Sequence, residues 1–159
     1  MGSNDEPRMA YGRLIAAVAA NDEEALAQVV SADIVDHGSV PGQPPGLAGI
    51  VFWMRGMHAG LSGLTGRVED TVVEDNKVAA RMTWRGTHTG PFLGLAATRK
   101  PVKVASIHIL RFEDGLAVEW WGVPDLYGAL TELAPALNFK PADLPRAAVR
   151  SSEEARLAR

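Results

Sequence analysis

The sequence contains no cysteine among its 159 residues, so disulfide bonds, thiolate catalysis and sulfur-bound metals are excluded. No stretch approaches the roughly 18 uninterrupted apolar residues that a membrane span requires, and no membrane partner is expected. The first ten residues, MGSNDEPRMA, are polar and acidic and lack the apolar core of a signal peptide. These absences together predict a cytoplasmic protein.

Clustered positive charge is also missing. The formal net charge is −3 and no strong basic cluster occurs, so nucleic acid is not expected as a partner. Hydrophobic residues make up 47% and charged residues 22% of the chain, which is typical of a globular protein. The length suits one domain with a substantial core.

The first part of the chain has the periodicity of helices. Residues 9–20 place apolar side chains on one helical stripe, and residues 21–30 restart a helix with Asn21 as its predicted cap. Residues 35–46, VDHGSVPGQPPG, are rich in proline and glycine and are predicted to be loop. A third helix follows, with apolar residues recurring at Ile50, Met54, Met57 and Leu61.

From residue 66 onward the apolar period changes to two, which indicates strands. Two strands are predicted around the turn Asp75-Asn76, a third over 101–112 and a fourth over 116–122, after Asp114-Gly115. A short helix over 125–133 closes the domain.

Helices first and a meandering sheet afterwards predict an α+β fold. We expect a cone-shaped α+β barrel, in which a curved antiparallel sheet is wrapped by the N-terminal helices around a deep apolar pocket. The expected organisation is a disordered N-terminus at 1–8, the domain at 9–135, and a C-terminal extension at 136–159.

Three segments resemble the SnoaL-like polyketide cyclase family of the nuclear-transport-factor-two-like superfamily. They are VDHGSVPGQPPG (35–46), RGTHTGPFLGLAATRKPV (85–102) and HILRFEDGLAVEWWGVPDLYGALTEL (108–133). The resemblance implies the cone fold, a cofactor-free pocket and a homodimer or homotetramer. For the cyclases proper it implies intramolecular aldol closure of an anthracycline-type ring.

His108 is the first candidate for catalysis. Side chains alternate along a strand, so Ser106, His108 and Leu110 share one face. If Phe112 pairs with Leu116 across the hairpin, His108 faces Trp120. Burial would favour a neutral imidazole there. His108 is then either a core histidine or, as the resemblance implies, a group that polarises the substrate oxygen.

Gly122 departs from the pattern of the family. The resemblance implies a catalytic aspartate at this position, and glycine can neither give nor take a proton. Asp125 is the next carboxylate along the chain. It follows Pro124 and precedes a helix, so it is a natural N-cap that could also border the pocket and act as a proton acceptor.

Three further polar residues have two interpretations each. His88, flanked by glycines in GTHTG, could swing over the pocket as a proton acceptor or lie in a surface loop. The resemblance places His37 beside the pocket mouth, where it would contact substrate; otherwise it is an exposed turn residue. Arg81 is predicted to pair with Asp70 across two strands, and it would bind substrate only if that face turned inward.

The remaining candidates are apolar. Large apolar side chains can line a flat aromatic ligand, although most of them are core. Those predicted to bind substrate are Phe52, Trp53, Met57, Trp84 and Trp120. The four histidines show no ligand spacing, so no metal and no cofactor is predicted.

The sequence therefore predicts a small-molecule enzyme that performs cofactor-independent acid/base chemistry on an aromatic polyketide or similar ketone-rich substrate. Three alternatives stay open: a hydroxylase of the same fold that tailors polyketides, a binding protein for polycyclic ligands that turns nothing over, and an ester or epoxide hydrolase, which would need Asp70 and Arg81 to face the cavity.

Overall fold

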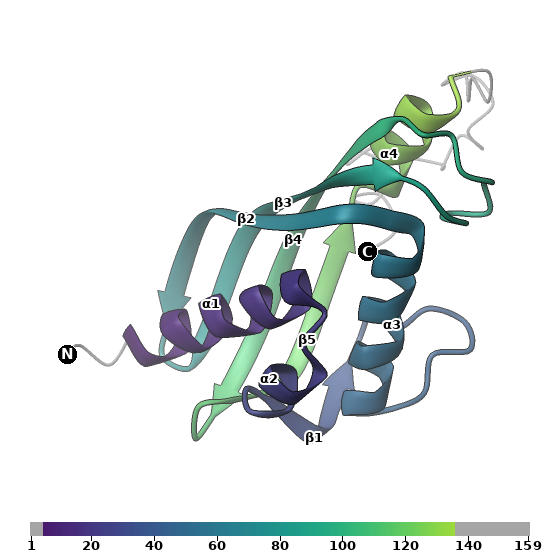
Figure 1. Cartoon of the computed structure of the whole chain (residues 1–159). Helices are drawn as coiled ribbons and strands as arrows, with labels where there is room; N and C mark the ends of the chain where they lie inside the picture. The colour runs from purple at the N-terminus through teal and green to yellow at the C-terminus, as the bar shows by residue number, and fades with distance from the viewer. Residues whose placement is uncertain (1–4, 136–159) are drawn as a thin grey trace, which may run out of the picture.

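The computed structural model describes residues 5–135, and Figure 1 shows how its elements are arranged. The helices are α1 (Asp5–Ala20), α2 (Glu23–Ala27), α3 (Leu47–Gly60) and α4 (Leu126–Leu133). The strands are β1 (Val30–Asp36), β2 (Leu61–Glu74), β3 (Lys77–His88), β4 (Pro101–Glu113) and β5 (Leu116–Pro124). They form one curved sheet in the order β1-β5-β4-β3-β2, so the α+β prediction is confirmed.

The sheet is mixed, whereas an antiparallel sheet was predicted. Strands β2 to β5 form the predicted antiparallel meander, but β1 adds a parallel edge beside β5. The expectation of a helix up to Val30 and a loop from residue 35 is therefore wrong. The burial pattern of β1 is irregular and its register shifts between Val30 and Val35. Because buried and exposed residues do not alternate regularly along β1, its sequence lacks the apolar period of two by which a strand is recognised.

The N-terminal helices also differ from the prediction in their limits. Helix α1 begins at Asp5, so the expectation of disorder is wrong for residues 5–8. Asp22, not Asn21, caps α2, and its carboxylate accepts a hydrogen bond of 2.9 Å from the backbone N–H of Ala25. Asn21 has a positive φ of 55° and separates the two helices. Residues 1–4 and the predicted extension at 136–159 lie outside the described residues.

One face of the sheet is covered by helices and encloses the core. Figure 1 shows α1 and α3 on the same side of the curved sheet. Along β4, every second residue from Val102 to Phe112 is buried, as the period of two requires. His108 and Ser106 therefore point inward with Leu110, and this part of the parity prediction is confirmed.

The register of the β4–β5 hairpin differs from the prediction by one residue at Phe112, beside the turn, and by two residues from Arg111 to Ser106. Asp114 and Gly115 both have positive φ, which allows a two-residue turn that pairs Glu113 with Leu116. A bulge beside Arg111 then places His108 opposite Gly122 rather than Trp120. Because the shift from Arg111 to Ser106 is even, the residues keep their faces, and only their partners change.

The other face of the sheet is open. Arg81 Nη2 lies 2.8 Å from Asp70 Oδ2 on this face, as predicted, and both side chains are exposed. Ile107, Ile109 and Val123 are exposed there too. Self-association stays a prediction. Among residues 5–135, no helix is both long and apolar enough to cross a membrane.

Candidate functional site

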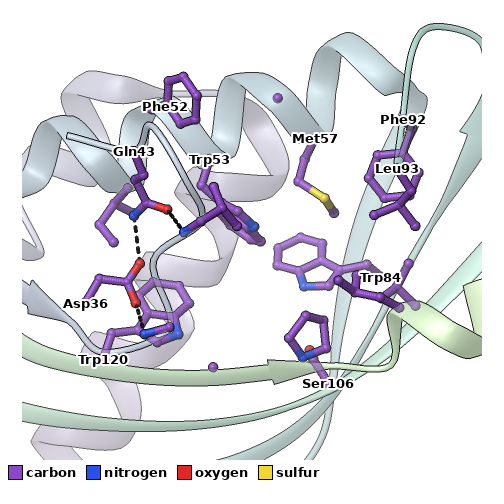
Figure 2. Close-up of a pocket in the computed structure, with 18 of the residues that line it drawn as sticks. Asp36, Gln43, Phe52, Trp53, Met57, Trp84, Phe92, Leu93, Ser106 and Trp120 are labelled. Atoms are coloured by element: carbon purple, nitrogen blue, oxygen red, sulfur yellow. Dashed lines mark hydrogen bonds between the residues drawn. The ribbon is translucent and has the colours of Figure 1, made fainter. Parts of the chain in front are cut away.

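A cavity of about 340 Å³ lies between helix α3, the loop after β1, and the inner face of β3, β4 and β5. Figure 2 shows how side chains from these elements point into it. Its walls are mainly apolar and aromatic. All five apolar residues predicted to bind substrate line it: Phe52, Trp53, Met57, Trp84 and Trp120.

Three tryptophans build the aromatic wall. Trp53 from α3 meets Trp84 and Trp120 edge to face, with ring centroids 6.1 and 6.0 Å apart. Such contacts hold the rings in fixed orientations, and a fixed aromatic surface suits a flat ligand. Trp84 Nε1 and Ser106 Oγ in the same walls are buried and have no hydrogen-bond partner among the described residues.

His108 lines the cavity from β4 and is 3% exposed. Its Nδ1 lies 3.0 Å from the hydroxyl oxygen of Tyr11 on helix α1, and its ring packs against Trp120 at 5.1 Å between centroids. Burial lowers the pKa of His108 from its ordinary 6.5 to about 4, because desolvation disfavours the charged imidazolium. The imidazole is therefore neutral at neutral pH.

This buried histidine predicts a loss of stability in acid. The pKa of His108 is lower in the folded than in the unfolded state, so the unfolded chain takes up the proton first as pH falls. Between pH 6.5 and 4 this residue alone is expected to reduce the free energy of unfolding by up to about 3 kcal/mol. Urea unfolding at several pH values measures the loss. The His108→Gln variant is the control, and an equally steep loss in that variant would refute the assignment.

Asp36 supplies the carboxylate of the cavity, and sequence analysis missed it. It is the last residue of β1 and lines the cavity beside the loop. Its Oδ1 accepts a hydrogen bond of 2.9 Å from the N–H of Gly38, and its Oδ2 accepts one of 2.7 Å from Nε2 of Gln43. Oε1 of Gln43 in turn accepts from the N–H of Val40 at 3.1 Å (Figure 2). These bonds hold the carboxylate and the loop in one arrangement.

His37, the residue of this segment that the sequence predicts to bind substrate, lies on the opposite face of the sheet. Its ring stacks on Trp121 with centroids 4.3 Å apart, and its Nε2 lies 3.3 Å from Glu119. Ile34 is buried and Val35 is exposed, so alternation turns Asp36 inward and His37 outward once β1 is recognised as a strand.

The two other predicted proton acceptors are also not part of the cavity lining. Asp125 caps α4, as predicted, and its carboxylate accepts a hydrogen bond of 2.8 Å from the N–H of Gly128. His88 is fully buried at the end of β3, and its Nδ1 accepts from the N–H of Thr98 at 3.2 Å. Arg81 lies on the open face, away from the cavity.

Among residues 5–135, Asp36 and His108 are consequently the two ionisable side chains in the cavity lining. The carboxylate of Asp36 could accept a proton from a ligand in the cavity, and the neutral imidazole of His108 lines the same cavity. Within residues 5–135, no group of three or more His, Asp or Glu side chains is placed to share a metal ion. This arrangement can support proton abstraction beside a carbonyl and stabilisation of the resulting oxyanion.

A family model for the SnoaL-like polyketide cyclase matches residues 8–133. The chain belongs to the SnoaL-like polyketide cyclase family. Among curated proteins, none matches the chain.

Solved structures of the family are similar to this fold. TsrD from Streptomyces laurentii is 28% identical, with a TM-score of 0.76 over 82% of this chain and 96% of that one. IdmH from Streptomyces antibioticus, a proposed polyketide cyclase, is 28% identical, with a TM-score of 0.71 over 80% and 97%. AclR from Streptomyces galilaeus, a proposed hydroxylase, is 28% identical, with a TM-score of 0.71 over 82% and 97%.

The SnoaL-like fold of this chain has a distinctive feature at Gly122, where the resemblance implies an aspartate. An ideal Cβ on Gly122 would lie 2.8 Å from Nε1 of Trp120 and 3.7 Å from Cδ2 of His108. The first distance is too short for a real contact, so the indole of Trp120 occupies the space that a side chain at position 122 would need. The absence of an acid at position 122 and the position of the Trp120 indole therefore go together: the indole can lie here because residue 122 has no side chain.

Proposed function

We propose that this SnoaL-like protein catalyses an aldol-type ring closure of a neutral, ketone-rich polycyclic substrate without a cofactor. The observation that carries the proposal is the composition of the cavity: one carboxylate, Asp36, and one neutral imidazole, His108, within aromatic and apolar walls. These are the two kinds of group that enolate chemistry requires.

In the proposed reaction, Asp36 takes a proton from the carbon beside a carbonyl. The imidazole of His108 stabilises the enolate oxygen that forms. The enolate carbon then attacks a second carbonyl of the same molecule, and the new alkoxide takes back the proton held by Asp36. One carbon–carbon bond forms, the proton is returned, and the product is an isomer of the substrate.

The cavity also supports the proposed class of substrate. The edge-to-face tryptophans offer flat apolar surfaces, which suit fused rings. Among the described residues, no Lys or Arg is part of the lining, and Asp36 is negatively charged when ionised. A neutral ester or ketone is therefore expected to bind better than a free carboxylate, whose charge would be repelled and left unpaired.

Hydroxylation is the second candidate, and the similarity to AclR favours it. Mass spectrometry separates the possibilities when the protein is incubated with an anthraquinone-type ester that carries a ketone side chain. Ring closure leaves the mass unchanged but alters the chromatogram and the absorption spectrum. Hydroxylation adds one oxygen atom, and it requires dioxygen and a two-electron reductant in the assay, because the second oxygen atom is reduced to water. Binding without any product would favour a ligand-binding protein.

The expected result is an isomeric product. In the same assay His108→Ala is expected to lower turnover by about 100-fold, because one oxyanion donor is lost. Undiminished turnover in this variant would remove His108 from the mechanism. Phe52→Ala, which changes a half-exposed residue of the cavity wall, serves as a control for general damage to the cavity.

A further inference from the structure

Tyr11 is a buried residue that the proposed reaction does not use directly. It lies on helix α1, and its side chain is 1% exposed. Its hydroxyl oxygen is 3.0 Å from Nδ1 of His108 and 3.4 Å from the sulfur of Met82. One phenolic proton therefore has two acceptors within reach.

The choice between the acceptors determines where the imidazole keeps its own proton. A neutral imidazole has one N–H and one lone pair, on different nitrogens. If Tyr11 donates to Nδ1, the proton of His108 is on Nε2. If Tyr11 donates to the sulfur of Met82 instead, Nδ1–H can donate to the phenolic oxygen, and Nε2 is left as an acceptor.

The chemistry of the groups favours the first arrangement. The phenolic O–H is the more acidic donor of the pair, imidazole nitrogen is the more basic acceptor, and a thioether sulfur accepts only weakly. Burial raises the pKa of Tyr11, because desolvation disfavours the phenolate. Both partners are therefore neutral, and the hydroxyl keeps the proton that it donates.

The other ring nitrogen, Nε2, belongs to a residue that lines the cavity. Among the described residues, Nε2 of His108 has no hydrogen-bond partner. Its neighbour in the ring, Cδ2, lies 3.7 Å from the position that a Cβ on Gly122 would take, and both residues line the cavity. The edge of the imidazole that carries Cδ2 and Nε2 is thus the edge on the side of Gly122.

We propose that Tyr11 is a positioning residue that fixes the tautomer of His108, so that Nε2–H is held as a hydrogen-bond donor toward a carbonyl or enolate oxygen in the cavity. The statement that Nε2–H of His108 binds a substrate oxygen rests on the proposed function. The tautomer itself is a property of the protein without substrate. Tyr11 thereby links the packing of α1 on the sheet to the protonation pattern of the site.

Nitrogen NMR of the side chains tests the tautomer. In uniformly labelled protein at pH 7, long-range proton–nitrogen spectra distinguish a protonated from an unprotonated ring nitrogen, and the loss of signals in His108→Gln assigns the residue. The expected result is a protonated Nε2 and an unprotonated Nδ1. A proton on Nδ1 in the wild-type protein would overturn the proposal, whether or not any variant folds.

Two variants test the role of Tyr11. Tyr11→Phe keeps the ring but removes the hydroxyl, so the His108 signals are expected to shift toward a mixture of tautomers. Met82→Leu removes the rival acceptor and is expected to leave the tautomer unchanged. A wild-type pattern in Tyr11→Phe would show that other contacts fix the ring.

Measurements of turnover, combined with the NMR result, show whether the inference about Tyr11 or the proposed function has failed. In the ester assay, Tyr11→Phe is expected to lower kcat about tenfold with little change in KM, because the substrate still fits and only the donor is less often correctly protonated. If Nε2 carries the proton but no product forms, the proposed function fails and the inference stands. If product forms while Nδ1 carries the proton, the inference fails alone.

Discussion

If Asp36 is the proton acceptor, as proposed, Asp36→Asn is expected to lower turnover of the anthraquinone-type ester by about 1000-fold while leaving the fold intact. Asparagine has nearly the same shape and can still accept the hydrogen bond from the N–H of Gly38. It cannot take a proton from carbon. The measurement is kcat/KM for ring closure, with thermal unfolding of each variant as the check on folding.

Two controls isolate the carboxylate. Gln43→Leu removes the 2.7 Å hydrogen bond to Asp36 and loosens the loop without removing the base, so a much smaller loss is expected. Asp125→Asn replaces a carboxylate outside the cavity lining by another good helix cap, and it is expected to be neutral. If Asp125→Asn abolished turnover and Asp36→Asn did not, the base would be the residue first suggested by the sequence.

The parts of the fold that sequence analysis predicted well have a strong local period. Strand β4 alternates between buried and exposed residues over its whole length, so the inward direction of His108 followed from parity alone. The exposed pair Asp70 and Arg81 followed in the same way from the short turn between β2 and β3. A two-residue error in the register of the next hairpin did not change either conclusion.

The parts that were missed depend on contacts between distant segments. Strand β1 exists because β5, more than 80 residues later in the chain, offers it an edge. Only the alternation of β1 turns the side chain of Asp36 inward, so a sequence in which β1 is not recognised gives no reason to prefer Asp36 to its neighbour His37. The tie between Tyr11 and His108 spans a separation of 97 residues, and no local pattern could reveal it.

Gly122→Asp, which restores the acid that the family resemblance implies, is expected to destabilise the protein rather than improve its activity. The new side chain would displace the indole of Trp120, which is buried and packs against Trp53 and His108. Overpacking costs about 1–3 kcal/mol, and a carboxylate without a cationic partner adds to this. A loss of about 4 kcal/mol in the free energy of unfolding is expected, measured by urea denaturation.

A double-mutant cycle identifies the cause. If the indole is the obstacle, Gly122→Asp costs less when Trp120→Ala has already removed it, and a coupling of at least about 1 kcal/mol is expected. Gly12→Ala, on a helix position with nothing within 4 Å of the new Cβ, is the control and is expected to be neutral or slightly stabilising. Additive effects of the two substitutions would contradict the steric account. Coupled effects would mean that one substitution cannot place an acid at position 122 without displacing the indole of Trp120, in line with the proposal that Asp36 is the proton acceptor.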